Sequence, residues 1–186
     1  MALTLVMVSP MESVKNTVSE LKRIVSDPGL KSKKEAKKEH IRAVILEKMD
    51  LEEMGRRALG RNWRGRTEAE RKEYLEVFTQ YIEVFYRKQV FESVEFINSV
   101  DIKYLKERVD GEFAEVDVEV VPKQGDSVKL TFRLHIKDGQ WKAYDVVVEN
   151  ISQVGNLRAQ FDRIIEKEKF AGFLKRLREK IQELDR

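Results

Sequence analysis

The chain has 186 residues, of which 41% are hydrophobic and 37% are charged. This length and composition are typical of one soluble globular domain with a highly charged surface. Its 36 basic side chains are nearly balanced by 33 acidic ones, and a net charge of +3 lacks the strong basic excess of a nucleic-acid-binding domain. Cysteine is absent, which excludes disulfides and thiolate metal sites but is compatible with cytoplasm or periplasm.

The N-terminal segment, residues 1–8, is short and apolar. It lacks the basic region and the small-residue cleavage site of a complete signal peptide. Two interpretations remain open from these residues: the tail of an export signal, or an apolar arm packed on the domain. No apolar run in the chain approaches the roughly 20 residues of a membrane span.

The first part of the chain has the period of amphipathic helices. Apolar residues recur at steps of three and four from Met11 to Val25, and Asp27-Pro28-Gly29 is predicted to end this helix. Ser32 and Glu35 have the spacing of a capping box, which predicts that a second helix begins there.

Two more helices are expected before the chain changes character. A short helix over residues 51–58 is predicted to end at Gly60. Thr67 and Glu70 form a second capping-box pattern, which opens a helix over residues 67–90 with a wide aromatic face.

The segment after residue 98 alternates apolar and polar residues, as strands with one buried face do. Asp110-Gly111 and Asp138-Gly139 are typical of tight hairpin turns, and residues 122–126 supply a third turn. Four strands of an antiparallel meander are therefore predicted, over residues 100–104, 114–120, 128–136 and 141–148.

Helical periodicity returns at the C-terminus. Leu157 and Phe161 share one face with Ile164 and Ile165, whereas the apolar residues from 170 to 184 lie on another face. Helices, then an antiparallel sheet, then helices predict an α+β domain.

Residues that could catalyse a reaction are few. His40 is expected on a helix and His135 on the polar side of a strand, so both are interpreted as surface histidines. No His, Asp and Glu cluster has zinc spacing, and no metal site is predicted. Asp145 and Glu149 would share one face if both lay in the strand, and paired carboxylates can act as acid and base. A solvent-facing or ion-paired role is the favoured interpretation, so no catalytic residue is assigned.

The remaining apolar residues exceed what a thin two-layer core needs. Periodicity alone does not distinguish a filled core from a lined hydrophobic cavity, and both interpretations stay open here. A sheet wrapped by helices can leave a cavity between its layers, which is where ligand sites are often found.

Two segments resemble the signatures of a known family. Residues 50–67 (DLEEMGRRALGRNWRGRT) resemble the pattern D-F/L-x-x-M-x-R-x-A-L-G-x-x-W-R-x-x-T. Residues 141–161 (WKAYDVVVENISQVGNLRAQF) resemble W-K-V-Y-D-V-x-I-E-G-V-S-L-V-x-N-Y-R-x-Q-F. The family is the MlaC-type, toluene-tolerance group of periplasmic phospholipid-binding proteins, and the resemblance extends over about residues 11–180. The chain departs from the second pattern at Ala143, Asn150-Ile151, Gln153 and Leu157.

The resemblance implies a soluble periplasmic lipid carrier rather than an enzyme. The implied fold is cone-shaped and similar to nuclear transport factor, with N-terminal helices, a curved four-stranded antiparallel sheet, C-terminal helices and a hydrophobic pocket for acyl chains. The implied cargo is phospholipid, moved between an outer-membrane lipoprotein complex and an inner-membrane ABC transporter complex, which would support outer-membrane lipid asymmetry. On this interpretation residues 1–10 are the remnant of an export signal, and residues 11–186 form one monomeric lipid-binding domain without a cofactor.

We therefore expect acyl chains to insert between the aromatic helix and the sheet. Arg158 is a candidate for the head-group phosphate, although a structural ion pair is the favoured role. Two alternatives remain: a carrier of hopanoid or sterol-like lipid, or a small-molecule enzyme of the same fold that uses Asp145 as a base. The predicted lipid-binding residues are Leu59, Trp63, Phe78, Ile82, Phe85, Tyr104, Val118, Phe132, Tyr144, Val146, Ile151, Val154 and Phe161.

Overall fold

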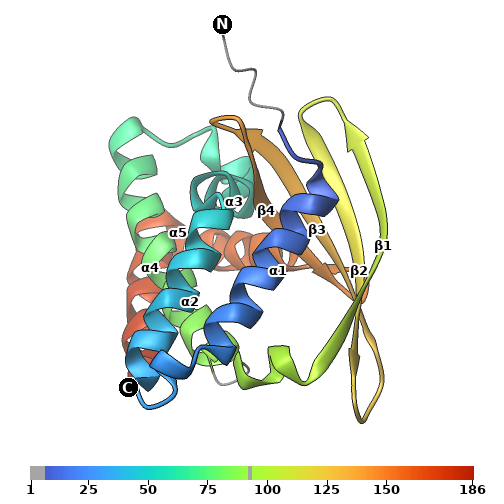
Figure 1. The fold of residues 1–186 in the computed structure, drawn as a ribbon. Helices are drawn as coiled ribbons and strands as arrows, with labels where there is room; N and C mark the ends of the chain where they lie inside the picture. Colours follow the sequence, from blue (N-terminus) through green and yellow to red (C-terminus); the bar gives the residue numbers. More distant parts are fainter. Residues whose placement is uncertain (1–6, 92–93) are drawn as a thin grey trace, which may run out of the picture. The chain divides into compact units, whose positions relative to one another are not determined.

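The computed structural model describes residues 7–91 and 94–186, which form two compact units that we take in turn. The sheet unit consists of Met1–Met49 and Glu95–Asn150, and the helix unit of Asp50–Val94 and Ile151–Arg186. The order of elements confirms the predicted α+β class, with helices before and after an antiparallel sheet (Figure 1).

The sheet unit begins with helices α1 (Pro10–Ser26) and α2 (Lys34–Lys48), joined by the 3-10 turn η1 (Pro28–Leu30). Helix α1 ends at the predicted stop, where the Asp27 side chain accepts a hydrogen bond from the Gly29 amide. The capping box predicted at Ser32 is wrong, because α2 begins two residues later with Lys33 as an N-cap that makes no side-chain bond.

A meander of four strands completes this unit after the 3-10 turn η3 (Val94–Asn98): β1 (Val100–Asp110), β2 (Phe113–Pro122), β3 (Val128–Lys137) and β4 (Gln140–Val148). Consecutive strands pair antiparallel. Asp138 and Gly139 both have positive φ, at 52° and 73°, as a two-residue hairpin turn of the predicted kind requires. The two-residue strand β5 (Ile151–Ser152) ends the order β1-β2-β3-β4-β5, so the sheet has five strands rather than four.

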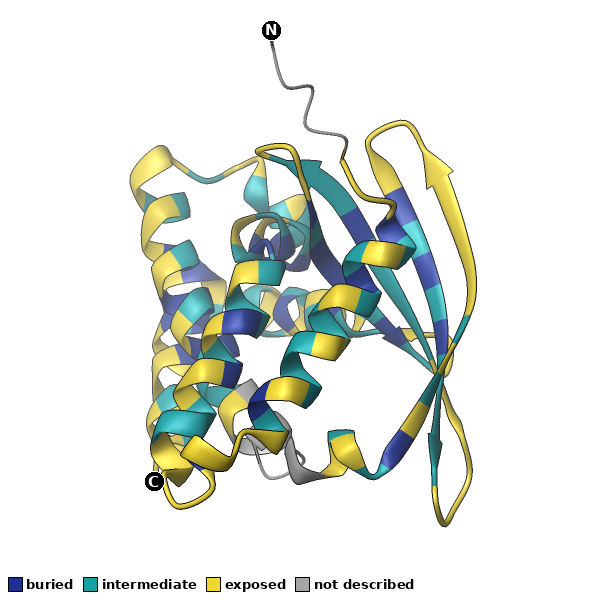
Figure 2. Ribbon diagram, viewed as in Figure 1, coloured by how far each residue is buried: buried dark blue, intermediate teal, exposed yellow. Residues whose placement is uncertain are grey.

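One face of the sheet carries the core of this unit, and α1 packs on it. Val14 of α1 is buried with Val116, Leu134 and Trp141 of the sheet. Outside this core, β1 is exposed along most of its length, whereas the buried positions gather on β2 and β4 (Figure 2).

The helix unit contains α3 (Leu51–Leu59), the 3-10 turn η2 (Gly60–Trp63), α4 (Glu68–Phe91) and α5 (Gln153–Leu184). Gly60 ends α3 as predicted, with φ 54° and ψ −125°, a conformation available to glycine because it has no Cβ. The capping box before α4 is confirmed: the Thr67 amide donates to Glu70, and the Glu70 amide donates to Thr67 Oγ1. Helix α5 is interrupted at Lys169, whose φ of 61° and ψ of 176° are not helical.

Candidate functional site

The apolar face of the sheet brings together four of the predicted lipid-binding residues. Residues directly opposite each other in antiparallel strands share a face. Tyr104 pairs with Val118 across β1 and β2, and Phe132 pairs with Val146 across β3 and β4. The two rows that contain them are Tyr104, Val118, Leu130 and Val148, and Val116, Phe132 and Val146.

Helix α1 covers this face only in part. Val116 and Val118 are buried, at 0% and 2% exposure. Tyr104, Phe132 and Val146 keep part of their side-chain surface, although Tyr104 and Phe132 pack against the buried cluster. Within the sheet unit, these side chains therefore form a large apolar surface that α1 does not fully cover.

A β-bulge in β4 directs the predicted residue Tyr144 to the other face. The register shifts between Arg133 and Leu134, which makes Tyr144 the extra residue of its strand. Its ring stands edge-on to those of Phe113 and His135, with centroids 6.2 and 5.7 Å away. Tyr144 consequently lies opposite the rows described above, on the polar side of the sheet.

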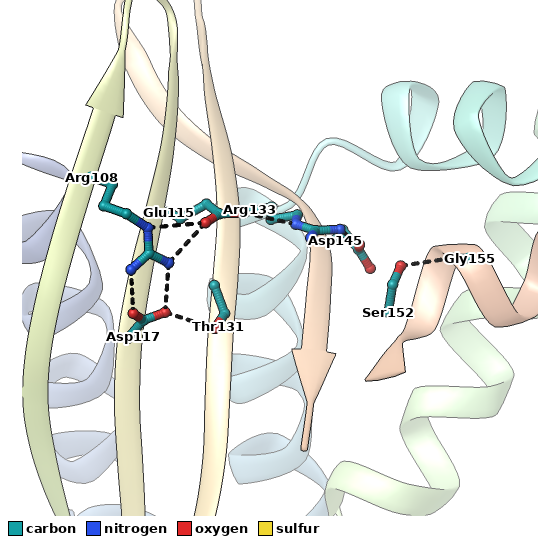
Figure 3. A network of polar contacts seen from close by, with 8 residues as sticks. All are labelled: Arg108, Glu115, Asp117, Thr131, Arg133, Asp145, Ser152 and Gly155. Atoms are coloured by element: carbon teal, nitrogen blue, oxygen red, sulfur yellow. Dashed lines mark hydrogen bonds and ion pairs between the residues drawn. The ribbon is translucent and has the colours of Figure 1, made fainter. Parts of the chain in front are cut away.

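The polar face of the sheet carries a continuous set of charged contacts. Arg108 Nη1 lies 2.6 Å from Asp117 and Nη2 lies 2.8 Å from Glu115, while Arg133 joins Glu115 at 3.0 Å to Asp145 at 3.2 Å. Hydrogen bonds from Arg108 lower the pKa of Asp117 and the pKa of Glu115. Figure 3 shows the network formed by Arg108, Glu115, Asp117, Thr131, Arg133 and Asp145.

The candidate base Asp145 belongs to this network. It is 3% exposed, and its carboxylate accepts a hydrogen bond from Arg133. Glu149 lies beyond the end of β4, has φ 46°, and accepts a bond from the Lys129 amide at 2.5 Å. The condition for an acid–base pair, that Asp145 and Glu149 both lie in the strand, is not met.

The helix unit is built around an aromatic cluster, which holds two of the predicted residues. Phe161 lies 4.8 Å from Phe173 between ring centroids, and Phe78 lies 6.3 Å from Phe161. Tyr74 contacts these three rings and donates a hydrogen bond to the Gly55 carbonyl at 2.9 Å. Burial raises the pKa of Tyr74 well above its ordinary value. The prediction of the site omitted Tyr74 and Phe173, although both lie on the apolar stripes of their helices.

The remaining predicted residues of the helix unit differ widely in exposure. Leu59, Ile82 and Val154 are buried at 0%, 2% and 4% exposure, whereas Ile151 is 60% exposed. Half-buried side chains complete the set: Trp63, which is edge-on to Tyr74, and Phe85, which is stacked on Tyr81.

Arg158 has an exposed side chain whose stem is held against Gly60. A Cβ added to Gly60 would meet Arg158 Cδ at 2.6 Å. The favoured ion pair is not seen, since within residues 7–91 and 94–186 the structure gives the Arg158 guanidinium no acidic partner. The neighbouring arginines are paired: Arg56 with Glu53 at 2.6 Å, and Arg61 with Glu166 at 2.5 Å.

Two surface hollows occur among the described residues. A groove of about 740 Å³ follows one side of α4, with Trp63 and Leu75 among its apolar lining and Glu68 and Glu76 among its charged lining. A smaller hollow of about 270 Å³ lies beside Trp141, whose Nε1 donates to the Val8 carbonyl at 3.1 Å. The described part of the chain contains no cluster of His, Asp and Glu suited to a metal ion. None of its helices has the length and apolar character needed to cross a bilayer.

Comparison with known proteins identifies the family. A solved structure of a phospholipid-binding protein from Ralstonia solanacearum, in complex with a phospholipid, superimposes with a TM-score of 0.79 at 21% identity. The match covers 96% of this chain and 100% of that one, which shows that the two share a fold. No curated protein matches the chain. The family model for MlaC protein matches residues 15–179, which is most of the sequence. The chain belongs to the MlaC family.

Proposed function

We propose that this protein binds phospholipid by its acyl chains. The observation that carries the proposal is the apolar surface on the sheet, where Tyr104, Phe132 and Val146 remain half-buried beside the core under α1. Family membership and the phospholipid bound to the Ralstonia protein support the same chemistry.

The physical scale of lipid extraction requires a large apolar surface. Burying one methylene contributes roughly 0.8 kcal/mol. A single acyl chain of about 14 carbons therefore gives only marginal membrane binding, and a two-chain lipid is held far more firmly by the bilayer. A carrier must cover most of both tails, and two rows of seven aliphatic and aromatic side chains are the kind of surface that this task needs.

We further propose that the protein is a monomeric periplasmic carrier that transfers its lipid between an inner-membrane ABC transporter complex and an outer-membrane lipoprotein complex. The proposal assigns binding and transfer rather than catalysis, with the lipid as cargo and no cofactor. The remaining predicted residues, Leu59 to Ile82 on the helices included, are proposed as further contacts for the tails, and Arg158 as the contact for the phosphate.

The test is native mass spectrometry of protein purified without detergent, followed by extraction of the bound lipid. We expect a mass increment that matches phospholipid and is lost on denaturation. A hopanoid or sterol in the extract would replace phospholipid as the cargo, and a protein that stays lipid-free after incubation with vesicles would refute lipid carriage.

Charged substitutions test the proposed surface. Val146→Asp introduces a carboxylate beside Phe132, and we expect the folded variant to lose bound lipid. Val109→Asp is the matched control, because Val109 is a valine of the same sheet that is 56% exposed. Lipid retained by folded Val146→Asp at the level of the control would contradict the placement of the tails on this face.

A further inference from the structure

Helix α5 consists of two halves whose apolar faces point in opposite directions along a straight helix. At 3.6 residues per turn, the nine residues from Phe161 to Phe170 correspond to about 900°, which places the two side chains about 180° apart. Both are nevertheless buried in the helix unit, at 3% and 7% exposure. The break at Lys169 reconciles these facts, because it rotates the second half until Phe170 and Phe173 face the aromatic cluster.

The break is maintained under strain. Lys169 has φ 61° and ψ 176°, a region of backbone space that is essentially restricted to glycine. Arg66 lies over the Phe170 ring at 4.7 Å, and its Nε is buried without a hydrogen-bond partner among the described residues. Undocking of residues 170–184 would release the backbone strain at Lys169 and return Arg66 Nε to water.

The second half of α5 has the composition of a helix that lies on an anionic lipid surface. Residues 170–184 contain four basic and two acidic side chains. The bases Lys175, Arg176 and Lys180 are exposed, while Phe173 and Leu177 lie buried on the opposite side. A basic polar face opposite an aromatic and aliphatic face is typical of interfacial helices.

We propose that residues 170–184 are a releasable membrane-binding helix, hinged at Lys169, that undocks from the aromatic cluster and inserts its apolar face into an anionic lipid surface. The proposal rests on the proposed lipid-carrier function and adds how the carrier engages a membrane. Strain at the hinge lowers the cost of opening, and the anionic surface supplies a new partner for both faces of the helix.

Cross-linking tests the undocking. Glu73 of α4 and Arg178 of α5 form an ion pair at 2.6 Å, and both side chains are about half exposed. Since the chain has no cysteine, Glu73→Cys combined with Arg178→Cys allows a short bis-maleimide to tie the two helices together. The assays are flotation with vesicles of phosphatidylcholine that contain phosphatidylglycerol, and exchange of fluorescent phospholipid.

We expect the cross-linked protein to keep its bound lipid while vesicle binding and lipid exchange fall at least about tenfold, the shift produced by roughly 1.4 kcal/mol. The same variant without cross-linker is the control. Exchange and flotation that match this control would overturn the proposal while leaving lipid carriage intact, whereas a wild-type protein without bound lipid would refute lipid carriage itself.

Substitution of the hinge gives an independent test. Lys169→Gly relieves the strain of the docked form and weakens a continuous helix, so we expect vesicle binding to fall about tenfold. Lys169→Ala is the matched control, because it removes the same charge but keeps the strain, and it should bind within about twofold of wild type. Equal binding by the glycine and alanine variants would contradict the hinge.

Discussion

The junction between α3 and η2 allows a sharp test of the helix unit. Gly60→Ala places a Cβ where φ is 54° and ψ is −125°, and it brings that carbon to 2.6 Å from Arg158 Cδ. The backbone strain should cost about 1–3 kcal/mol. Displacement of the arginine stem should add about 1 kcal/mol, the lower end of the cost of overpacking.

We therefore expect Gly60→Ala to lower the free energy of unfolding by about 2–4 kcal/mol. Because 1 kcal/mol changes Tm by about 2–4 °C in a chain of this size, the melting temperature should fall by roughly 5–10 °C. Urea unfolding followed by tryptophan fluorescence, together with a thermal melt, measures both quantities.

A double-mutant cycle separates the two costs. Arg158→Ala removes the atoms that the new Cβ meets, so Gly60→Ala in that background should cost about 1 kcal/mol less than alone. Gly65→Ala is the control, since Gly65 has no atom within 4 Å of an added Cβ and should stay within about 0.5 kcal/mol of wild type. A Gly60→Ala variant as stable as the control would refute the reasoning, and equal costs in both backgrounds would refute its steric part.

Three further predictions concern stability. Because Arg108 lowers the pKa of Asp117 in the folded state, this carboxylate stabilises the fold above its unfolded pKa near 4, and that contribution is lost as the pH falls through this value into the range of the folded pKa; the urea midpoint should decrease on acidification, less steeply in Arg108→Met, and an equal slope in both proteins would contradict the prediction. Thr67→Ala removes the side-chain oxygen that accepts the Glu70 amide and should cost about 1 kcal/mol in urea unfolding, with Thr67→Ser as the control that keeps the cap. Phe173→Ala opens a cavity in the aromatic cluster at a residue only 1% exposed and should cost about 3–5 kcal/mol, whereas Phe96→Ala at a 48% exposed position should cost far less; similar costs would argue against a packed cluster.

Local chemistry explains why much of the fold could be predicted. The Asp27-Pro28-Gly29 stop, the Thr67 cap and the Asp138-Gly139 turn depend on neighbours a few residues away, so the sequence contains both partners of each interaction. Ser32 shows the limit of such motifs, because the helix begins two residues later despite suitable spacing. The fifth strand, only two residues long, has too few positions for a period to be recognised.

Side-chain direction was predictable only where the period is unbroken. Alternation placed Tyr104, Val118, Phe132 and Val146 on one face, and the register confirms that they share it. Tyr144 escaped this rule because a bulge adds one residue to β4 and reverses the side to which its ring points. A bulge is set by pairing with another strand, which an isolated strand sequence does not reveal.

The sequence by itself determined which residues are apolar and with what period, including the two opposed faces of the last helical stretch. Only the tertiary structure decided that both faces meet one aromatic cluster, that the change of direction falls on Lys169, and that Arg61 is paired while Arg158 is not. The physical reason is that periodicity depends on bonds within one element, whereas strain, ion pairing and burial depend on partners about 100 residues away in the chain, as between Arg61 and Glu166.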